Sequence, residues 1–169
     1  MSPGACLALA WDWWFGSRVH RSFDLGRTWE EPRSAPAFPA DAGWKVDKVW
    51  HVTPGRASEP GVVYAGVEPA ALFKSSDDGQ TWSWIEGLSR HPTRDQWQPG
   101  AGGLCLHTIV LDPKQPGRAY AAISAAGLFR TEDNGATWTP RNQGVRANFM
   151  PDQPPVYPEW GQCVHNMVQ

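Results

Sequence analysis

Cysteine, net charge and long apolar runs are all scarce in this sequence, and each scarcity excludes a class of protein. The three cysteines, Cys6, Cys105 and Cys163, are too few for the disulfide framework of a small secreted domain. The 15 Lys and Arg residues do not outnumber the 17 Asp and Glu residues, so no basic excess exists to neutralise nucleic-acid phosphates. No apolar run approaches the roughly 18 residues that a membrane helix needs. We therefore expect neither a nucleic-acid partner nor a membrane segment.

The N-terminal residues, MSPGACLALAWDWW, contain an apolar stretch but lack the basic residues that open a signal peptide. We therefore expect a cytoplasmic protein with reduced thiols. Secretion is the alternative, if a further segment precedes this chain.

Glycine, proline and tryptophan are abundant. The chain holds 17 Gly and 16 Pro, which break helices and favour turns. It also holds 11 Trp, whereas disordered chains are poor in aromatic residues. This composition predicts a turn-rich, all-β globular fold.

One motif, [ST]-x-D-x-G-x-T-W, occurs three times, and its tryptophans are 53 and then 56 residues apart. In a tight turn the Asp accepts backbone N–H hydrogen bonds and the Gly supplies a positive φ, so we expect these residues to be structural. The large indole can wedge between neighbouring sheets. The motif residues are Ser22, Asp24, Gly26, Thr28 and Trp29; Ser75, Asp77, Gly79, Thr81 and Trp82; and Thr131, Asp133, Gly135, Thr137 and Trp138.

Apolar runs around each motif predict four short strands per repeat, which fits a β-propeller blade of four antiparallel strands. The expected strands are 7–11, 18–22 and 27–31; 48–53, 62–67, 71–75 and 80–86; 106–111, 118–124, 127–131 and 136–141; and 162–168. The whole chain, 1–169, is thus read as a partial propeller of about three blades. Its parts are an incomplete blade 1 (1–40), blade 2 (41–90), blade 3 (104–144) and the start of blade 4 (162–169). It forms an open arc, part of a larger propeller, or a self-assembling unit.

These motifs resemble the Asp-box, or BNR repeat, of sialidases, sortilin-type receptors and glycosyl hydrolase-like propellers, and the chain looks like a truncated member. The resemblance implies that the motif turns lie opposite the ligand face. That face is then formed by loops 11–17, 31–47, 66–71, 87–105, 124–127 and 142–163. These loops carry Trp11, Trp13, Trp14, Trp44, Trp97, Tyr157 and Trp160. The Arg-Ile/Leu-Pro motif of sialidases is absent, which puts sialidase activity in doubt.

The inner strands, aligned on Pro54 and Pro113, place Lys48 level with His107, and the match of 163–165 to 105–107 adds His165. We expect these three side chains to form an arc that binds a ligand or simply lines a wet channel. The Cys-x-His pairs lack the further ligands of a zinc site, so we expect neither a metal nor a cofactor.

Glycoside hydrolysis normally requires two carboxylates about 5–9 Å apart. The catalytic candidates are Glu68, Asp95 and Asp47, with a solvated surface role as the alternative for Glu68. His91, Arg94 and Trp97 share one loop and could bind a sugar or pin that loop to the propeller. The resemblance to sialidases implies three arginines that bind the carboxylate of sialic acid. Arg90, Arg94 and Arg146 are the candidates, with a role as surface charges as the alternative.

The sequence thus predicts an Asp-box propeller that binds a carbohydrate or small polar ligand. One hypothesis adds hydrolysis of a glycosidic bond in that ligand. The alternative is a non-catalytic scaffold that binds a protein partner or associates with itself through open blade edges.

Overall fold

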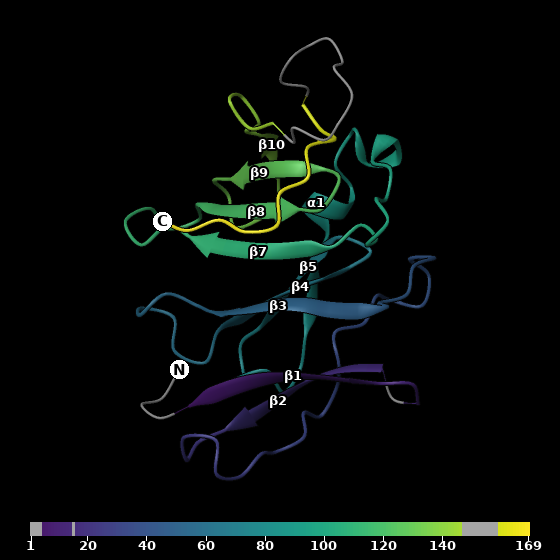
Figure 1. Ribbon diagram of the computed structural model, residues 1–169. Helices are drawn as coiled ribbons and strands as arrows, with labels where there is room; N and C mark the ends of the chain where they lie inside the picture. The colour runs from purple at the N-terminus through teal and green to yellow at the C-terminus, as the bar shows by residue number, and fades with distance from the viewer. Residues whose placement is uncertain (1–4, 15, 147–158) are drawn as a thin grey trace.

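The computed structural model describes residues 5–14, 16–146 and 159–169. The chain is an all-β partial propeller of three antiparallel sheets, as predicted (Figure 1). Blade 1 comprises β1 (Cys6–Asp12) and β2 (Gly16–Ser22). Blade 2 comprises β3 (Lys48–Pro54), β4 (Val63–Glu68), β5 (Ala71–Ser75) and β6 (Ser83–Ile85). Blade 3 comprises β7 (Leu106–Leu111), β8 (Ala119–Ile123), β9 (Gly127–Thr131) and β10 (Thr139–Pro140).

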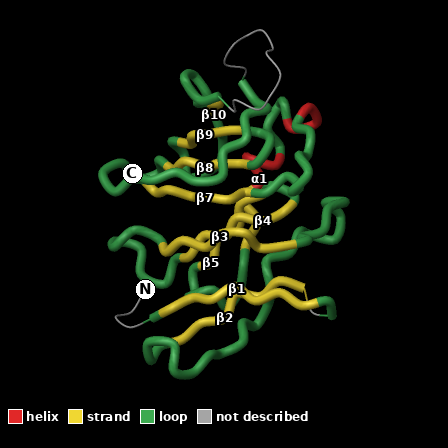
Figure 2. Tube along the Cα trace, viewed as in Figure 1, coloured by secondary structure: helices red, strands yellow, loops and turns green. Residues whose placement is uncertain are grey.

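In blades 2 and 3 the strands pair in chain order, and β3 and β7 are the inner strands that contact each other. A short helix α1 (Glu86–Ser89) and a 3-10 turn η1 (Arg94–Gln96) follow blade 2, at the red segments of Figure 2. No helix within the described ranges is long and apolar enough to cross a membrane.

Two expected strands are absent from the described residues. At 27–31 a single bridge joins Glu30 to Arg21. The segment 162–168 is not a strand, although it lies beside β7 (Figure 1). Thr108 Oγ1 of β7 donates to the His165 carbonyl (3.1 Å). A strand needs a neighbouring strand to pair with its backbone groups, and no described strand pairs with this segment.

The three motif turns share one hydrogen-bond pattern. In blade 2, Asp77 Oδ1 accepts from the Ser75 hydroxyl (2.7 Å) and the Thr81 N–H (2.9 Å), while Asp77 Oδ2 accepts from the Thr81 hydroxyl (2.7 Å). Gly79 has φ +84° and the preceding Asp78 has φ +56°, so the turn needs two left-handed residues in succession. The same bonds recur around Asp24 and Asp133.

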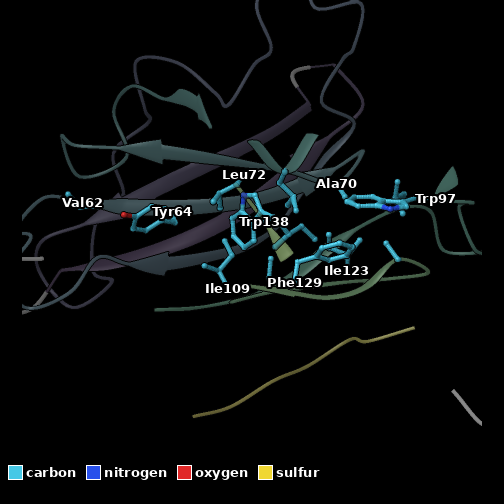
Figure 3. Packing of buried hydrophobic residues seen from close by; sticks show 14 residues of the cluster. Val62, Tyr64, Ala70, Leu72, Trp97, Ile109, Ile123, Phe129 and Trp138 are labelled. Atoms are coloured by element: carbon cyan, nitrogen blue, oxygen red, sulfur yellow. The ribbon is translucent and has the colours of Figure 1, made fainter. Parts of the chain in front are cut away.

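Two apolar clusters join the blades, and the burial of each motif tryptophan depends on whether it packs into one of them. Trp138 is 6% exposed and lies in the cluster between blades 2 and 3 with Leu72 and Phe129 (Figure 3). Trp82 is half-buried against the cluster that joins blades 1 and 2. Trp29 is 45% exposed. Trp82 and Trp138 are thus covered by the blade that precedes each of them in the chain.

Both inner strands carry a β-bulge at the same place. The pairing of β3 with β4 shifts between Val49 and His51, and the pairing of β7 with β8 shifts between Leu106 and Thr108. Trp50 and His107 are therefore the bulged, equivalent residues, and bulges re-aim side chains. The alignment of Lys48 with His107 was wrong by two residues, because Pro54 pairs within the sheet while Pro113 lies beyond β7.

Candidate functional site

Three aromatic rings form a row across the inner strands of the arc. The ring centroids of Trp50 and His107 lie 5.0 Å apart in an edge-to-face arrangement. The His107 and His165 rings are stacked, with centroids 4.6 Å apart. The row thus runs from blade 2 across blade 3 to the C-terminal segment, and the bulges place its first two members. We call Trp50, His107 and His165 the ring row.

Two charged side chains flank the ring row at its blade 2 end. Lys48 and Glu68 are direct cross-strand partners on β3 and β4. Glu68 Oε2 accepts a hydrogen bond from Trp50 Nε1 (3.0 Å), which fixes both the carboxylate and the indole. The Lys48 ammonium lies 5.7 Å from the Trp50 ring centroid and 5.8 Å from that of Trp11. This region presents apolar ring faces, a cation and a carboxylate together.

Burial and neighbouring charges set the protonation of His107. Desolvation lowers the pKa of His107, the positive charge of His165 lowers it further, and Glu68 opposes both. Neutral His107 can therefore offer one N–H donor and one acceptor nitrogen at neutral pH. Burial, with Glu68 nearby, raises the pKa of the Cys105 thiol to about 12. Cys105 is thus a thiol and not a thiolate in this site.

The C-terminal segment is anchored by polar contacts. Cys163 Sγ and His165 Nε2 are 2.9 Å apart, and Cys163 Sγ also lies 3.9 Å from the Ser124 hydroxyl. Ser124 N–H donates to the carbonyl of Cys105. Over the ranges that the structure describes, no group of three His, Cys, Asp or Glu side chains could hold a metal ion.

Exposed indoles extend the aromatic surface beyond Lys48. Trp13 and Trp14, at the tip of the β1–β2 hairpin, are 87% and 91% exposed. Trp11 contacts Trp13 edge-to-face with centroids 5.2 Å apart. Of the other aromatic candidates, Trp160 packs on the core and Tyr157 lies outside the described residues.

His91, Arg94 and Trp97 belong to a different cluster. His91 and Trp97 are buried and both pack on Phe129 of β9. The Arg94 guanidinium lies 5.3 Å from the Trp44 ring and 5.2 Å from the Trp97 ring. These contacts hold the 87–105 loop on blade 3. Pinning of the loop to the propeller was the alternative to sugar binding for these residues.

The remaining charged candidates lie on the surface. Asp95 is exposed in η1, and Arg90 is exposed and paired with Glu86. Asp47 is exposed beside Lys48, and its N–H donates to the Glu68 carbonyl. Arg146 is exposed on the segment that follows blade 3. Of the three catalytic candidates, Glu68 alone lies within the described contacts of the ring row.

A hollow of about 560 Å³ opens at the other end of the inner strands, between 53–58 and 109–113. The Arg56 guanidinium in its wall donates to the carbonyls of Asp112 and Arg118 and pairs with Glu59. These bonds commit the cation to joining blades 2 and 3, so the hollow offers less ligand chemistry than the ring row.

Sequence reasoning missed Trp50, the residue that links Glu68 to His107. The equivalence of Trp50 with His107 appears only in the strand pairing of the structure. Val67 and Ile123 hold the same place in their blades, before the turn to the motif strand. Their partners on the inner strands are Val49 and Leu106, so the residues that follow these, Trp50 and His107, are equivalent. Proline positions misled the alignment because they mark loops, and loop lengths vary between repeats.

Comparisons with known proteins agree with a propeller architecture. No family model matches the chain. It is 28% identical over 81 residues to a probable oligoxyloglucan-reducing end-specific xyloglucanase of Neosartorya fischeri, covering 47% of this chain and 9% of that protein. The structure resembles the GH74 enzyme of Niastella koreensis with a TM-score of 0.57 and 16% identity, over 80% of this chain and 20% of that one.

A second solved structure, YCF48 bound to a D1 peptide, aligns with a TM-score of 0.45 and 21% identity, over 72% of this chain and 33% of that one. The chain thus spans a third or less of the length of each of these three proteins. The fold is that of a β-propeller fragment, and the sequence match is to a carbohydrate-active protein.

Proposed function

We propose that this chain is part of a carbohydrate-binding β-propeller and that the ring row, with Lys48 and Glu68, binds a sugar chain. The observation that carries the proposal is the row of Trp50 and His107 on the two inner strands and His165 on the C-terminal segment, beside a fixed carboxylate and a cation.

The chemistry of the ring row fits a sugar. A pyranose has an apolar C–H face, which an indole can cover, and a rim of hydroxyls, which need donors and acceptors. Trp50 provides the ring face, while Glu68 accepts and Lys48 donates. Sites of this kind combine aromatic walls with a few well-placed polar groups. Glu68 keeps an acceptor capacity beyond its bond to Trp50, because a carboxylate has about four lone-pair sites.

The sequence match to a xyloglucanase supports a plant-type β-glucan, and xyloglucan is the ligand that we propose. We would measure binding by affinity electrophoresis in gels that contain xyloglucan, and by calorimetry with its oligosaccharides. The test variants are Trp50→Ala and His107→Ala. The matched control is Trp29→Ala, which removes another part-exposed indole at a motif turn.

Trp50→Ala should weaken binding about tenfold, the equivalent of about 1.4 kcal/mol, while Trp29→Ala should leave it unchanged. Equal binding by wild type and Trp50→Ala would refute the site. Lack of binding by the wild type to xyloglucan and to a panel of other glycans would refute the function.

Hydrolysis of a glycosidic bond is the second candidate, favoured by the held carboxylate of Glu68. A glycosidase normally pairs such a group with a second carboxylate across the bond, and Asp47 or Asp95 are the candidates in this chain. Glu68→Gln should abolish release of reducing ends while Lys48→Ala, next to it, leaves measurable turnover. Unchanged turnover in Glu68→Gln would exclude this role.

A protein partner is the alternative ligand, and the exposure of Trp13 and Trp14 favours it. Exposed aromatic side chains are enriched at protein interfaces. Substitution of both by Ser would then abolish capture of the partner but leave glycan binding intact.

Membership of the Asp-box, or BNR, family and the blade boundaries at 1–40, 41–90, 104–144 and 162–169 belong to this proposal as well. The shared hydrogen-bond pattern around Asp24, Asp77 and Asp133 supports them.

A further inference from the structure

Strand β1 has one edge with which no described strand pairs. It pairs with β2 on one side, whereas its counterparts β4 and β8 each pair with an inner strand on the other side as well. The edge is seven residues long and contains neither Lys nor Pro. Leu9 and Trp11 on it are 40% and 46% exposed. A long apolar edge of this kind is a template for another strand.

The C-terminal segment has the sequence of the strand that would fit this edge. Residues 163–168 read Cys-Val-His-Asn-Met-Val, and residues 105–110, which include most of β7, read Cys-Leu-His-Thr-Ile-Val. The segment already lies next to β7 (Figure 1), and it is held there by the bond from Thr108 to the His165 carbonyl and by the stacked histidines. It thus occupies the place of the next inner strand, but no described strand pairs with it.

The outer face of blade 1 is also apolar, like a surface that another part of a protein covers. Trp29 is 45% exposed, and Phe23 and Leu25 next to it are 43% and 74% exposed. The equivalent indoles Trp82 and Trp138 are covered by the preceding blade. Three large apolar side chains at a motif turn therefore face solvent where a preceding blade would pack.

We propose that two copies of this chain associate, with the C-terminal segment of each copy pairing antiparallel with β1 of the other. Blade 3 of one copy then packs against the Phe23, Leu25 and Trp29 face of its partner. The two contacts are related by a two-fold axis, so the ring closes and β1 of each copy gains an inner neighbour. This association does not depend on the glycan-binding proposal, because it involves β1 and backbone groups of the tail.

The solution mass tests the proposal, because one chain is 18.7 kDa and the pair has twice that mass. We would measure it by light scattering across a concentration series. The test variant is the double substitution Asn166→Pro with Met167→Pro. Consecutive N–H groups of an extended segment point to opposite sides, so this double variant removes the partner-facing one whichever it is. The control, Asn166→Ala with Met167→Ala, makes the same side-chain loss but keeps both N–H groups.

Wild type and the alanine control should form the dimer, and the proline variant should be a monomer. A monomeric wild type at every concentration would overturn the proposal, as would a proline variant that dimerises as well as its control or a series of larger oligomers. A synthetic peptide of residues 161–169 is the second measurement, independent of whether the proline variant folds. Excess peptide should convert the wild-type dimer to monomer, and a dimer that the peptide leaves intact would contradict the pairing.

Discussion

Trp50 and His107 are the same residue position in two consecutive blades, and their rings touch. Each is the bulged residue of its inner strand, and their centroids are 5.0 Å apart. A bulge leaves one residue out of the pairing ladder and turns its side chain, so the same local irregularity in each blade aligns side chains from different repeats. This is how separate blades build one continuous surface.

The protonation of His107 provides a test of the ring row. The pKa of His107 should lie below its usual value of 6.5, because burial and the charge of His165 disfavour the imidazolium. His165→Ala should raise this pKa by removing a like charge, and Glu68→Gln should lower it further by removing an attractive one. An NMR titration of the His107 ring measures both. Shifts of the same sign in the two variants would contradict the arrangement.

Acid should weaken the motif turns. Hydrogen bonds from the Thr137 hydroxyl and N–H lower the pKa of Asp133 from 3.8 to about 2, and the pKa of Asp24 is about 2 for the same kind of reason. Because the folded pKa is below the unfolded one, this stabilisation is complete above pH 3.8 and is lost as the pH falls towards 2. Asp133→Asn should lower Tm at pH 5 and have little effect at pH 2. The exposed Asp41→Asn is the control, and an equal loss at both pH values would refute the linkage.

The motif tryptophans should differ in their contribution to stability. Trp138→Ala leaves a cavity between blades 2 and 3 and should reduce the free energy of unfolding by about 3–5 kcal/mol. Trp29→Ala should cost much less, about 1 kcal/mol in the monomer, because Trp29 is 45% exposed and lies in neither apolar cluster. Urea denaturation of the two variants measures the difference. Equal losses would show that the exposures do not report the packing.

Gly87 provides a steric test of blade contact. A Cβ at Gly87 would lie 2.2 Å from the Gly135 carbonyl oxygen, in the motif turn of blade 3. Gly87→Ala should therefore destabilise the protein by about 1–3 kcal/mol through overpacking. Gly102→Ala is the matched control, because a Cβ there meets nothing within 4 Å. A thermal melt in which both variants match wild type would contradict the close approach of α1 to blade 3.

The sequence was enough to predict the propeller architecture, because the repeated motif reports a turn that local hydrogen bonds determine. It overestimated the outer strands: 27–31 forms one bridge, and β6 and β10 are shorter than expected, since an outermost strand has a single neighbour to pair with. For the site, sequence reasoning found Lys48, Glu68, His107 and His165 but not Trp50. Their proximity depends on the bulges, which no local pattern in the sequence marks.

The graded burial of Trp29, Trp82 and Trp138 implies an order in which the molecule comes apart. In an array whose units contact only their neighbours, each unit is as stable as the interfaces that hold it. Blade 3 is joined to blade 2 by a cluster that includes Trp97, Phe129 and Trp138, whereas blade 1 contributes Val19 and Leu7 to a smaller one. In the monomer, fraying should therefore begin at the first blade, and hydrogen exchange should be fastest for the amides of β1 and β2.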